Sequence, residues 1–418
     1  MKPKIRLKGF DGEWDKKIMG DLGTTYSGLS GKSKTDFGNG NALYITFLNV
    51  LTNAIIDTSS FQNVDVRKGE RQNEVKKGDL LFNTSSETPS EVGMCSVMGE
   101  EIPNLYLNSF CFGFRLNDRS IDSLFFAYLM RSPIGRRLMT LLAQGATRYN
   151  LSKSILYKAE LQFPQTISEQ QSIANYFKSL DALIQSTTKK VASLKQLKEA
   201  SLISMFPQGN ETTPRVRFKG FEGEWEKKTI SKIGFTYSGL VGKSKNDFGT
   251  GDAQYITFMN VLCNATIDTS ILQKVNVAKS ESQNCVMKGD LLFNTSSETP
   301  EEVGLCAVMP ETIQNVYLNS FCFGLRLKDE EVCPEYFAYL MRSPVGRNLM
   351  KTIAQGISRY NLPKSQFCQT KLLFPKYHSE QQQIASYFHN LDNHISLQEQ
   401  RLEKLKQLKS ACLDQMFV

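Results

Sequence analysis

Residues 168–205 decide the fold: SEQQSIANYFKSLDALIQSTTKKVASLKQLKEASLISM, a stretch without proline or glycine. Ser168 followed by Gln171 has capping-box spacing and predicts that a helix begins there. The apolar residues that follow recur at the three- and four-residue spacing of a heptad: Ile173, Phe177, Leu180, Ile184, Val191 and Leu194. At ~1.5 Å per residue the helix would be about 57 Å long. An apolar seam of this length needs a partner.

A second stretch provides that partner. Residues 379–416 read SEQQQIASYFHNLDNHISLQEQRLEKLKQLKSACLDQM, with Ser379 and Gln382 at the same cap spacing. The seam continues in the same pattern: Ile384, Phe388, Leu391, Ile395, Leu402 and Leu405. We predict that the two helices pack together as a coiled coil.

The second half of the chain repeats the first. Trp14 matches Trp225, and the offset of 225 − 14 = 211 also maps KGDLLFNTSSETP at 77–89 onto 288–300 and YLNSFCFG at 106–113 onto 317–324. The offset is constant, so no insertion separates the copies. Each copy is one large module, too long for a solenoid repeat.

Each module combines strands and helices, which predicts an α+β fold with a long helix after each globular part. Short apolar runs between turn residues predict strands at 42–51 and 79–84. Periodic runs that end at proline or glycine predict helices at 121–132 and 133–144. The expected segments are a first domain (1–167), a helix (168–206), a linker (207–214), a second domain (215–378) and a C-terminal helix (379–418).

Composition limits the class of protein. The chain has 418 residues, 40% hydrophobic and 22% charged, with a net charge of +8 that favours polyanionic partners without requiring them. No apolar run approaches the ~18 residues of a membrane span, and the first residues do not resemble a signal peptide. Nine cysteines without a CxxC pair fit a reducing compartment, so we expect a cytoplasmic location.

Motifs for catalysis are missing from the sequence. Gly31-Lys32-Ser33 resembles the end of a P-loop, but Tyr26 stands where the motif needs its first glycine. Histidine occurs only at 378, 389 and 394, in or beside one of the two long helices, which argues against a metal or general-base role for a duplicated module. GxSxG and the Asn/Asp-Pro-Pro-Tyr/Phe segment of adenine methyltransferases are absent. We therefore expect no catalysis, no metal and no cofactor in this chain.

Three polar loops recur in both copies and are candidates for binding DNA. The first loop (26–40, 237–251) offers lysines to phosphates, the second (83–91, 294–302) offers groups that can bond base edges, and the third (144–150, 355–361) offers an arginine and a tyrosine. Each could equally be a solvated turn. The candidate residues are Lys32, Lys34, Asn83, Thr84, Ser85, Ser86, Glu87, Arg148, Tyr149 and Asn150, with their equivalents Lys243, Lys245, Asn294, Thr295, Ser296, Ser297, Glu298, Arg359, Tyr360 and Asn361.

The combination of motifs resembles the specificity subunits of type I restriction–modification systems. Phe-Pro-x-x-x-Ser-Glu-Gln-Gln followed by Ile-Ala occurs at 163–174 and again at 374–385. Lys-Gly-Asp-Leu-Leu, Gly-x-x-Arg-x-Asn-Leu and Leu-Lys-Gln-Leu-Lys also occur in each copy. The resemblance covers nearly the whole chain.

The resemblance implies that each globular part is a target-recognition domain reading one half of a split double-stranded DNA site. It implies that the two helices pair antiparallel and dock two methyltransferase subunits, which use S-adenosylmethionine. It also implies that motor-nuclease subunits, which use ATP and Mg²⁺, join for restriction. The family's two domains commonly differ, whereas these are nearly the same, so we expect two near-identical half-sites in inverted orientation. The alternative is a coiled-coil adaptor with duplicated protein- or carbohydrate-binding domains.

Overall fold

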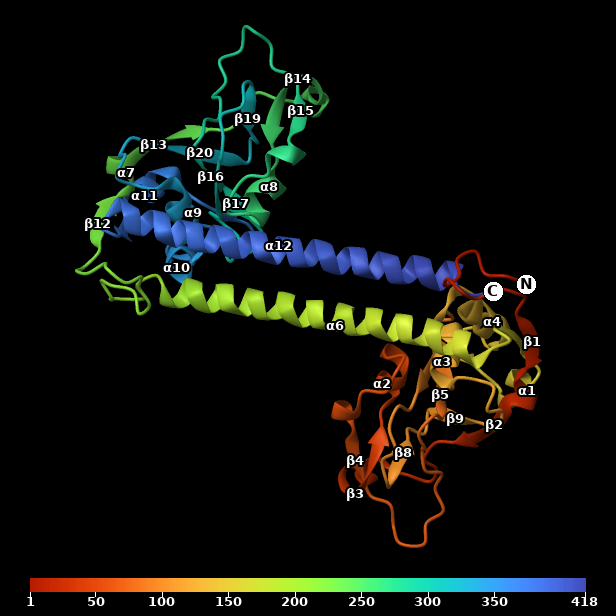
Figure 1. The fold of residues 1–418 in the computed structure, drawn as a ribbon. Coiled ribbons are helices and arrows are strands. Elements are labelled where there is room, and N and C mark those ends of the chain that lie inside the picture. Colours follow the sequence, from red (N-terminus) through yellow and green to blue (C-terminus); the bar gives the residue numbers. More distant parts are fainter. The chain divides into compact units, whose positions relative to one another are not determined.

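The computed structural model describes residues 1–418 and contains two compact units. Unit 1 comprises Met1–Thr188 with Gln400–Val418, and unit 2 comprises Lys189–Glu399. Two long helices, α6 (Ile167–Ser204) and α12 (His378–Gln415), each contribute to both units (Figure 1). Each long helix is therefore shared between the two units, whereas the predicted segments treated each helix as a segment of its own.

Unit 1 contains eleven short strands. They are β1 (Asp15–Ile18), β2 (Gly23–Ser27), β3 (Phe37–Ile45), β4 (Gln62–Val64), β5 (Leu80–Asn83), β6 (Ser85–Ser86), β7 (Cys95–Val97), β8 (Leu105–Leu107), β9 (Cys111–Leu116), β10 (Tyr149–Asn150) and β11 (Glu160–Phe163). An antiparallel sheet has the order β2-β9-β5-β7, and a second has the order β4-β3-β8 with β3 and β8 parallel. The remaining strands form the pairs β1-β11 and β10-β6.

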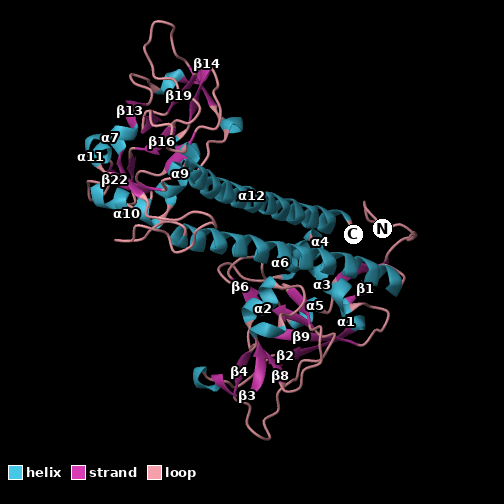
Figure 2. Ribbon diagram, turned by 60° about the vertical axis from the view of Figure 1, so that its left-hand side comes forward, coloured by secondary structure: helices cyan, strands magenta, loops and turns pink.

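Short helices connect these strands (Figure 2). They are α1 (Met19–Leu22), α2 (Phe47–Thr52), α3 (Ser123–Arg131), α4 (Pro133–Leu142) and α5 (Lys153–Leu156), with 3-10 turns η1 (Lys34–Asp36) and η2 (Thr58–Ser60). The predicted helices at 121–132 and 133–144 are confirmed as α3 and α4, which begin at caps made by Asp122 and Ser132.

The strand expected at 42–51 is wrong in its second half. Thr46 Oγ1 accepts a hydrogen bond from the Asn49 amide at 3.3 Å and caps α2, so residues 47–52 form a helix. The apolar run Phe47–Leu51 is too short for its periodicity to distinguish a strand from a helix.

Unit 2 repeats this architecture. Its strands are β12 (Glu226–Thr229), β13 (Gly234–Ser238), β14 (Phe248–Ile256), β15 (Gln273–Val275), β16 (Leu291–Asn294), β17 (Ser296–Ser297), β18 (Cys306–Val308), β19 (Val316–Leu318), β20 (Cys322–Leu327), β21 (Tyr360–Asn361) and β22 (Lys371–Phe374). Its helices are α7 (Ile230–Ile233), α8 (Phe258–Cys263), α9 (Pro334–Arg342), α10 (Pro344–Ile353) and α11 (Lys364–Gln369), with η3 (Lys245–Asp247) and η4 (Thr269–Ile271). The sheets have the equivalent orders β13-β20-β16-β18 and β15-β14-β19.

Both faces of the four-stranded sheet are buried. In β5, Leu80 and Phe82 belong to the main core of unit 1, while Leu81 between them belongs to a second core. Successive side chains of a strand point to opposite faces, so one short strand serves two cores. The main core also contains Trp14, and the start of α6 contributes Phe177.

Each main core is completed by the end of the long helix that follows the other copy. In unit 1, Phe417 just beyond α12 packs on Trp14, with ring centroids 6.3 Å apart, and on Phe177 at 5.7 Å. In unit 2, Phe206 just beyond α6 packs on Trp225 at 6.4 Å. The Met-Phe pair that ends each copy therefore fills the core that the globular part of the other copy forms.

The long helices run antiparallel within each unit. In unit 1, Tyr176 contacts Cys412 at 3.3 Å, and Asp181, further along α6, pairs with Lys409, earlier in α12, at 2.5 Å. In unit 2, Lys195 pairs with Glu399 at 2.7 Å and Lys198 with the earlier Asp392 at 2.5 Å.

The predicted seam residues face inward to different degrees. Ile173, Phe177, Leu180, Val191, Ile384, Phe388, Leu391 and Ile395 are buried, and Ile184, Leu194, Leu402 and Leu405 are partly buried. Thr187 and Ser201 occupy buried positions in the same heptad series, which the apolar pattern did not reveal.

The helices begin earlier than the cap spacing predicted. Helix α6 begins at Ile167, and Thr166 Oγ1 accepts from the Glu169 amide at 3.3 Å. Helix α12 begins at His378, so Ser168 and Ser379 lie within the helices. Glu169 is 2% exposed and pairs with Arg6 at 2.7 Å, which ties the start of the chain to the helix.

Candidate nucleic-acid interface

The second and third loops meet in each unit. In unit 1, Ser86 pairs with Tyr149 and Ser85 with Asn150 across β6 and β10. The Leu151 amide donates to the Thr84 carbonyl at 2.8 Å. Arg148 Nε donates to Ser85 Oγ at 3.2 Å, as Arg359 Nε does to Ser296 Oγ at 3.2 Å in unit 2. Loops separated by about sixty residues in sequence thus form one surface.

The start of the first loop joins this surface. Lys153 Nζ, just after the third loop, donates to Ser27 Oγ at 2.8 Å, and Lys364 donates to Ser238 Oγ at 2.9 Å. A Cβ on Gly28 would lie 2.1 Å from the Asn108 carbonyl oxygen, so only glycine permits this close approach. The Lys32–Lys34 end of the loop packs elsewhere, beside residues 65–72.

Several predicted residues are exposed and available to a ligand. Glu87, Arg148 and Asn150 project from the joined second and third loops, and Lys34 projects from the first. Their equivalents Glu298, Arg359, Asn361 and Lys245 are exposed as well. A carboxylate and a guanidinium exposed on one pair of joined loops could bond the donor and acceptor edges of base pairs.

Other predicted residues support the loop instead. Asn83 is fully buried, and its amide group donates to the Glu91 carbonyl at 3.0 Å and accepts from the Met94 amide at 2.6 Å. Ser86 Oγ donates to Glu91 Oε2 at 2.9 Å. The equivalents Asn294, Ser296 and Ser297 are buried. Thr84, Tyr149, Thr295 and Tyr360 are partly buried. The hydrogen bonds of Asn83 and Ser86 thus shape the loop.

Lys32 and Lys243 do not have the geometry expected of phosphate contacts. The Lys32 side chain is 4% exposed and pairs with Glu70 at 2.6 Å, and Lys243 pairs likewise with Glu281 at 2.6 Å. The hydrogen bond from Lys32 lowers the pKa of Glu70 to about 2, helped by bonds from Gln72 and the Arg67 amide. A glycine-rich loop with lysine suggests an exposed charge, but here the lysine joins the loop to the segment around Glu70.

Phe110 and Phe321 belong to the same surface and were missed by the sequence analysis. Each is 57% exposed in the turn between the strand pairs β8-β9 and β19-β20. The Arg148 guanidinium carbon lies 6.0 Å from the centre of the Phe110 ring. The repetition of YLNSFCFG in both copies was the available signal, but an alternating apolar string is more often core than surface.

Buried charged groups stabilise the strands and turns that carry the loops. The Asp79 carboxylate accepts from Tyr26 Oη at 2.6 Å and from Arg115 Nη2 at 2.6 Å, and burial raises the pKa of Tyr26 above its ordinary range. Arg136 donates to the Gly93 carbonyl at 3.0 Å, and burial lowers its pKa to about 10. Equivalent groups occupy unit 2. These residues fix the loop geometry.

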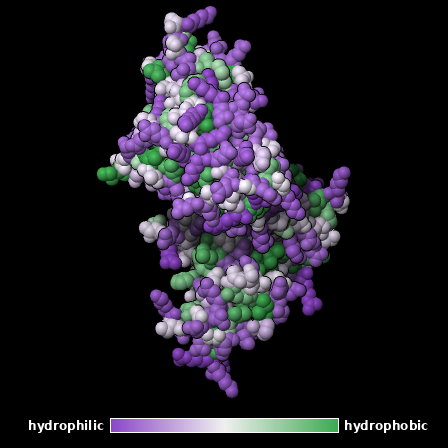
Figure 3. Space-filling view, turned by 90° about the vertical axis from the view of Figure 1, so that its left-hand side faces the viewer, coloured by the Kyte–Doolittle hydropathy of each residue, from purple (hydrophilic) through white to green (hydrophobic).

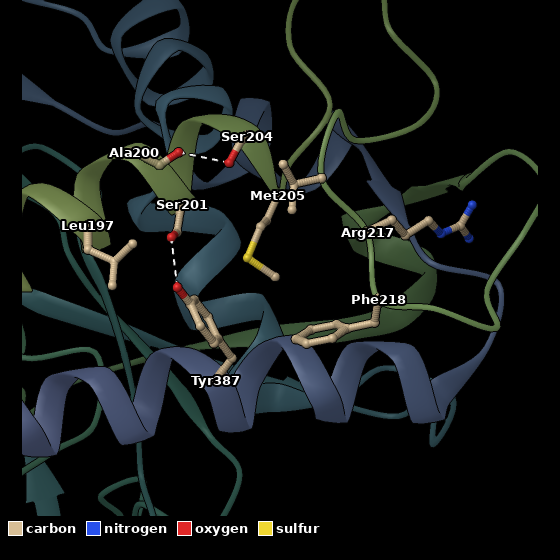
Figure 4. A pocket seen from close by; sticks show the side chains of 9 residues that line it. Leu197, Ala200, Ser201, Ser204, Met205, Arg217, Phe218 and Tyr387 are labelled. Atoms are coloured by element: carbon tan, nitrogen blue, oxygen red, sulfur yellow. Dashed lines mark hydrogen bonds between the residues drawn. The ribbon is translucent and has the colours of Figure 1, made fainter.

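One hollow is lined mainly by apolar groups. A hollow in unit 2, about 360 Å³, is lined by apolar groups such as Met205 and Phe218, with Ser201 and Tyr387 bonded at 2.9 Å (Figure 4). No cluster of three or more His, Cys, Asp or Glu could hold a metal ion, and no helix is both long and apolar enough to cross a membrane. The face in Figure 3 is mostly hydrophilic, with hydrophobic side chains in small separate groups.

Comparison with known proteins gives consistent matches. The family model of the type I restriction modification DNA specificity domain matches residues 11–196 and 222–407. A protein of Methanocaldococcus jannaschii, assigned as the specificity subunit of the type I restriction enzyme MjaX, is 24% identical over 198 residues. That alignment covers 46% of this chain and 45% of the relative, so the chain spans less than half of that relative's length.

Solved structures share the fold over the full length. The S subunit of a type I restriction-modification system from M. genitalium superposes with a TM-score of 0.61 and 16% identity, covering 100% of this chain and 99% of that one. A chain from a structure concerned with assembly and conformational transition of the type I R-M system gives 0.52 and 13%, covering 96% and 97%. At these identities the likeness concerns the fold alone.

Proposed function

The chain belongs to the type I restriction modification DNA specificity family, and on that premise we propose that it is the non-catalytic subunit that selects the DNA sequence. Each unit reads one half of a split double-stranded site through its joined second and third loops. One observation supports this proposal: in both units a hydrogen bond from the third-loop arginine joins the second and third loops, and each joined pair of loops carries an exposed glutamate and an exposed arginine. With DNA as the ligand, we expect the protein to act in the cytoplasm.

The partners follow from the same premise. We propose that the paired helices dock two methyltransferase subunits, which bind S-adenosylmethionine and methylate adenine, and that motor-nuclease subunits using ATP and Mg²⁺ join for restriction. The antiparallel direction of α6 and α12 within each unit supports the helix pairing that the proposal requires. The half-sites would then be near-identical and inverted.

DNA binding is tested by titrating a labelled duplex library with the full chain at several salt concentrations. Retention of duplex that falls steeply with salt is expected, because bound phosphates release counterions. Salt-independent or absent retention, together with capture of a protein or glycan, would instead identify a coiled-coil adaptor.

Base reading by the second loop is tested by Glu87→Ala and Glu298→Ala. Each should relax the preference at one position of one half-site, by ~1–3 kcal/mol, because a carboxylate can accept from a cytosine amino group. The two variants are controls for each other: the half-site read by the unaltered unit should keep its preference. Unchanged methylation of all natural sites by both would count against base reading by these residues.

A further inference from the structure

Two large aromatic side chains are held exposed at the candidate interface. Phe110 and Phe321 occupy equivalent positions and are exposed to the same extent, 57%. Single exposed apolar residues are common on protein surfaces. These two differ because each lies in a turn bonded to the second loop, on the surface for which we propose DNA binding, and because Phe110 lies beside Arg148 of the third loop.

The turn that carries each ring is rigid. In unit 1 the Phe110 amide donates to Asn108 Oδ1 at 2.8 Å, and the Cys111 amide donates to the Asn108 carbonyl at 3.0 Å. In unit 2 the Phe321 amide donates to Asn319 Oδ1 at 2.9 Å. A turn that is already held by hydrogen bonds loses little conformational freedom on binding, which favours a contact residue.

The turn is also bonded directly to the second loop. The Phe110 carbonyl accepts from the Thr84 amide at 2.9 Å, and the Thr84 carbonyl accepts from the Leu151 amide at 2.8 Å. The same bonds link Phe321, Thr295 and Leu362 in unit 2. Backbone hydrogen bonds thus connect the turn that carries the ring to the second loop, and the second loop to the residue that follows the third. In unit 1 the ring lies beside the exposed Arg148.

We infer that Phe110 and Phe321 are specificity-determining contacts, each packing against the 5-methyl group of a thymine in its half-site. This inference rests on the proposed DNA-reading function. Thymine is the one base that presents a methyl group in the major groove, and a phenyl ring is an apolar partner for it. The neighbouring arginine supplies a cationic contact to the adjoining base or phosphate.

The test uses the full chain and a randomised double-stranded DNA library, from which the wild type selects its preferred site. Phe110→Ala should bind that site about tenfold more weakly and lose the preference for thymine in one half, and Phe321→Ala should do so in the other half. Phe235→Thr is the matched control: this ring is 43% exposed on β13, and Thr24 stands at the equivalent position in unit 1.

Duplexes with uracil in place of a single thymine then identify the contact. Removal of the one methyl group should weaken wild-type binding roughly fourfold at one position in each half. Phe110→Ala should bind the thymine and uracil versions of its half-site equally. Thermal unfolding of each variant shows whether the fold is intact, and Phe110→Leu provides an apolar replacement if alanine destabilises the turn.

Three results would overturn the inference. They are selected half-sites without thymine on either strand, folded phenylalanine variants that bind like the wild type, and weaker binding with undiminished discrimination between thymine and uracil. In each case the wild type would still select a sequence, so the proposed function would stand. Failure of the wild type to select any sequence would instead refute the proposed function.

Discussion

Units 1 and 2 have the same architecture but are closed by different parts of the chain. The unit 2 core takes Phe206 from residues within its continuous range, 189–399. Unit 1 is discontinuous, because its core includes Phe417, which lies 417 − 14 = 403 positions after Trp14. Unit 1 therefore depends on residues 400–418, which follow unit 2 in the sequence.

The largest expected effect comes from the residues that close the cores. Phe417→Ala should lower the free energy of unfolding of unit 1 by about 3–5 kcal/mol, because it leaves a cavity against Trp14. The matched variant Phe206→Ala should act on unit 2. Each unit has one tryptophan, so Trp fluorescence in Trp225→Phe and Trp14→Phe backgrounds follows the units separately. If the Trp14 fluorescence of Phe417→Ala changes at the same denaturant concentration as that of the wild type, Phe417 does not stabilise the core of unit 1.

Asp181 and Asp392 provide a comparison in which the units should behave alike. Asp181 accepts from Tyr128 Oη at 2.8 Å and pairs with Lys409, and Asp392 does the same with Tyr339 at 3.0 Å and Lys198. Asp181→Ala leaves a largely buried hydroxyl unpaired and should cost about 1–3 kcal/mol, with Asp392→Ala similar. Denaturant unfolding measures both. Unaltered midpoints would show that these contacts do not couple the helices to α3 and α9.

The pairing of the two long helices and the repetition of one module could be predicted from sequence, because heptad spacing and a constant offset are periodic signals. The helix starts could not, since Thr166 and Glu169 offer the same cap spacing as Ser168 and Gln171. Composition also could not show that Lys32 pairs with Glu70. Among the predicted DNA-contact residues, Glu87 and Arg148 are exposed, as contact with a ligand requires. Asn83 is buried, because its amide satisfies the backbone of its own loop, which the sequence pattern could not show.

The segments at 66–75 and 277–286 show where the copies differ in charge. Exposed Arg67 and Arg71 in unit 1 correspond to Ala278 and Ser282 in unit 2. If this segment touches phosphates, replacing Arg67 by Ala and Arg71 by Ser should reduce the slope of log affinity against log salt by up to about 2. The reverse exchange, Ala278→Arg with Ser282→Arg, should raise it. Slopes that stay the same in both exchanges would place the segment away from DNA.

The smallest expected effect concerns acid stability, where the units should again agree. Lys32 and Lys243 hold the pKa of Glu70 and Glu281 at about 2, below the ordinary glutamate value. A lowered pKa stabilises the folded state above the unfolded-state value of ~4.3, and this stabilisation is lost as pH falls through about 2. Unfolding midpoints of wild type and Glu70→Gln should therefore differ at pH 7 and converge toward pH 2. Glu281→Gln should show the same convergence in unit 2. A difference between wild type and Glu70→Gln that persists at pH 2 would show that the lowered pKa is not its cause.

The most direct test of sequence reading by the two units is single-molecule sequencing of genomic DNA from cells that express this chain with the methyltransferase proposed as its partner. Two units that present the same loops should yield a split motif with methylated adenines in two inverted, near-identical halves. A split motif with unrelated halves would contradict equal reading by the two units. No new methylation, with the same methyltransferase active beside another specificity subunit, would contradict the proposed function itself.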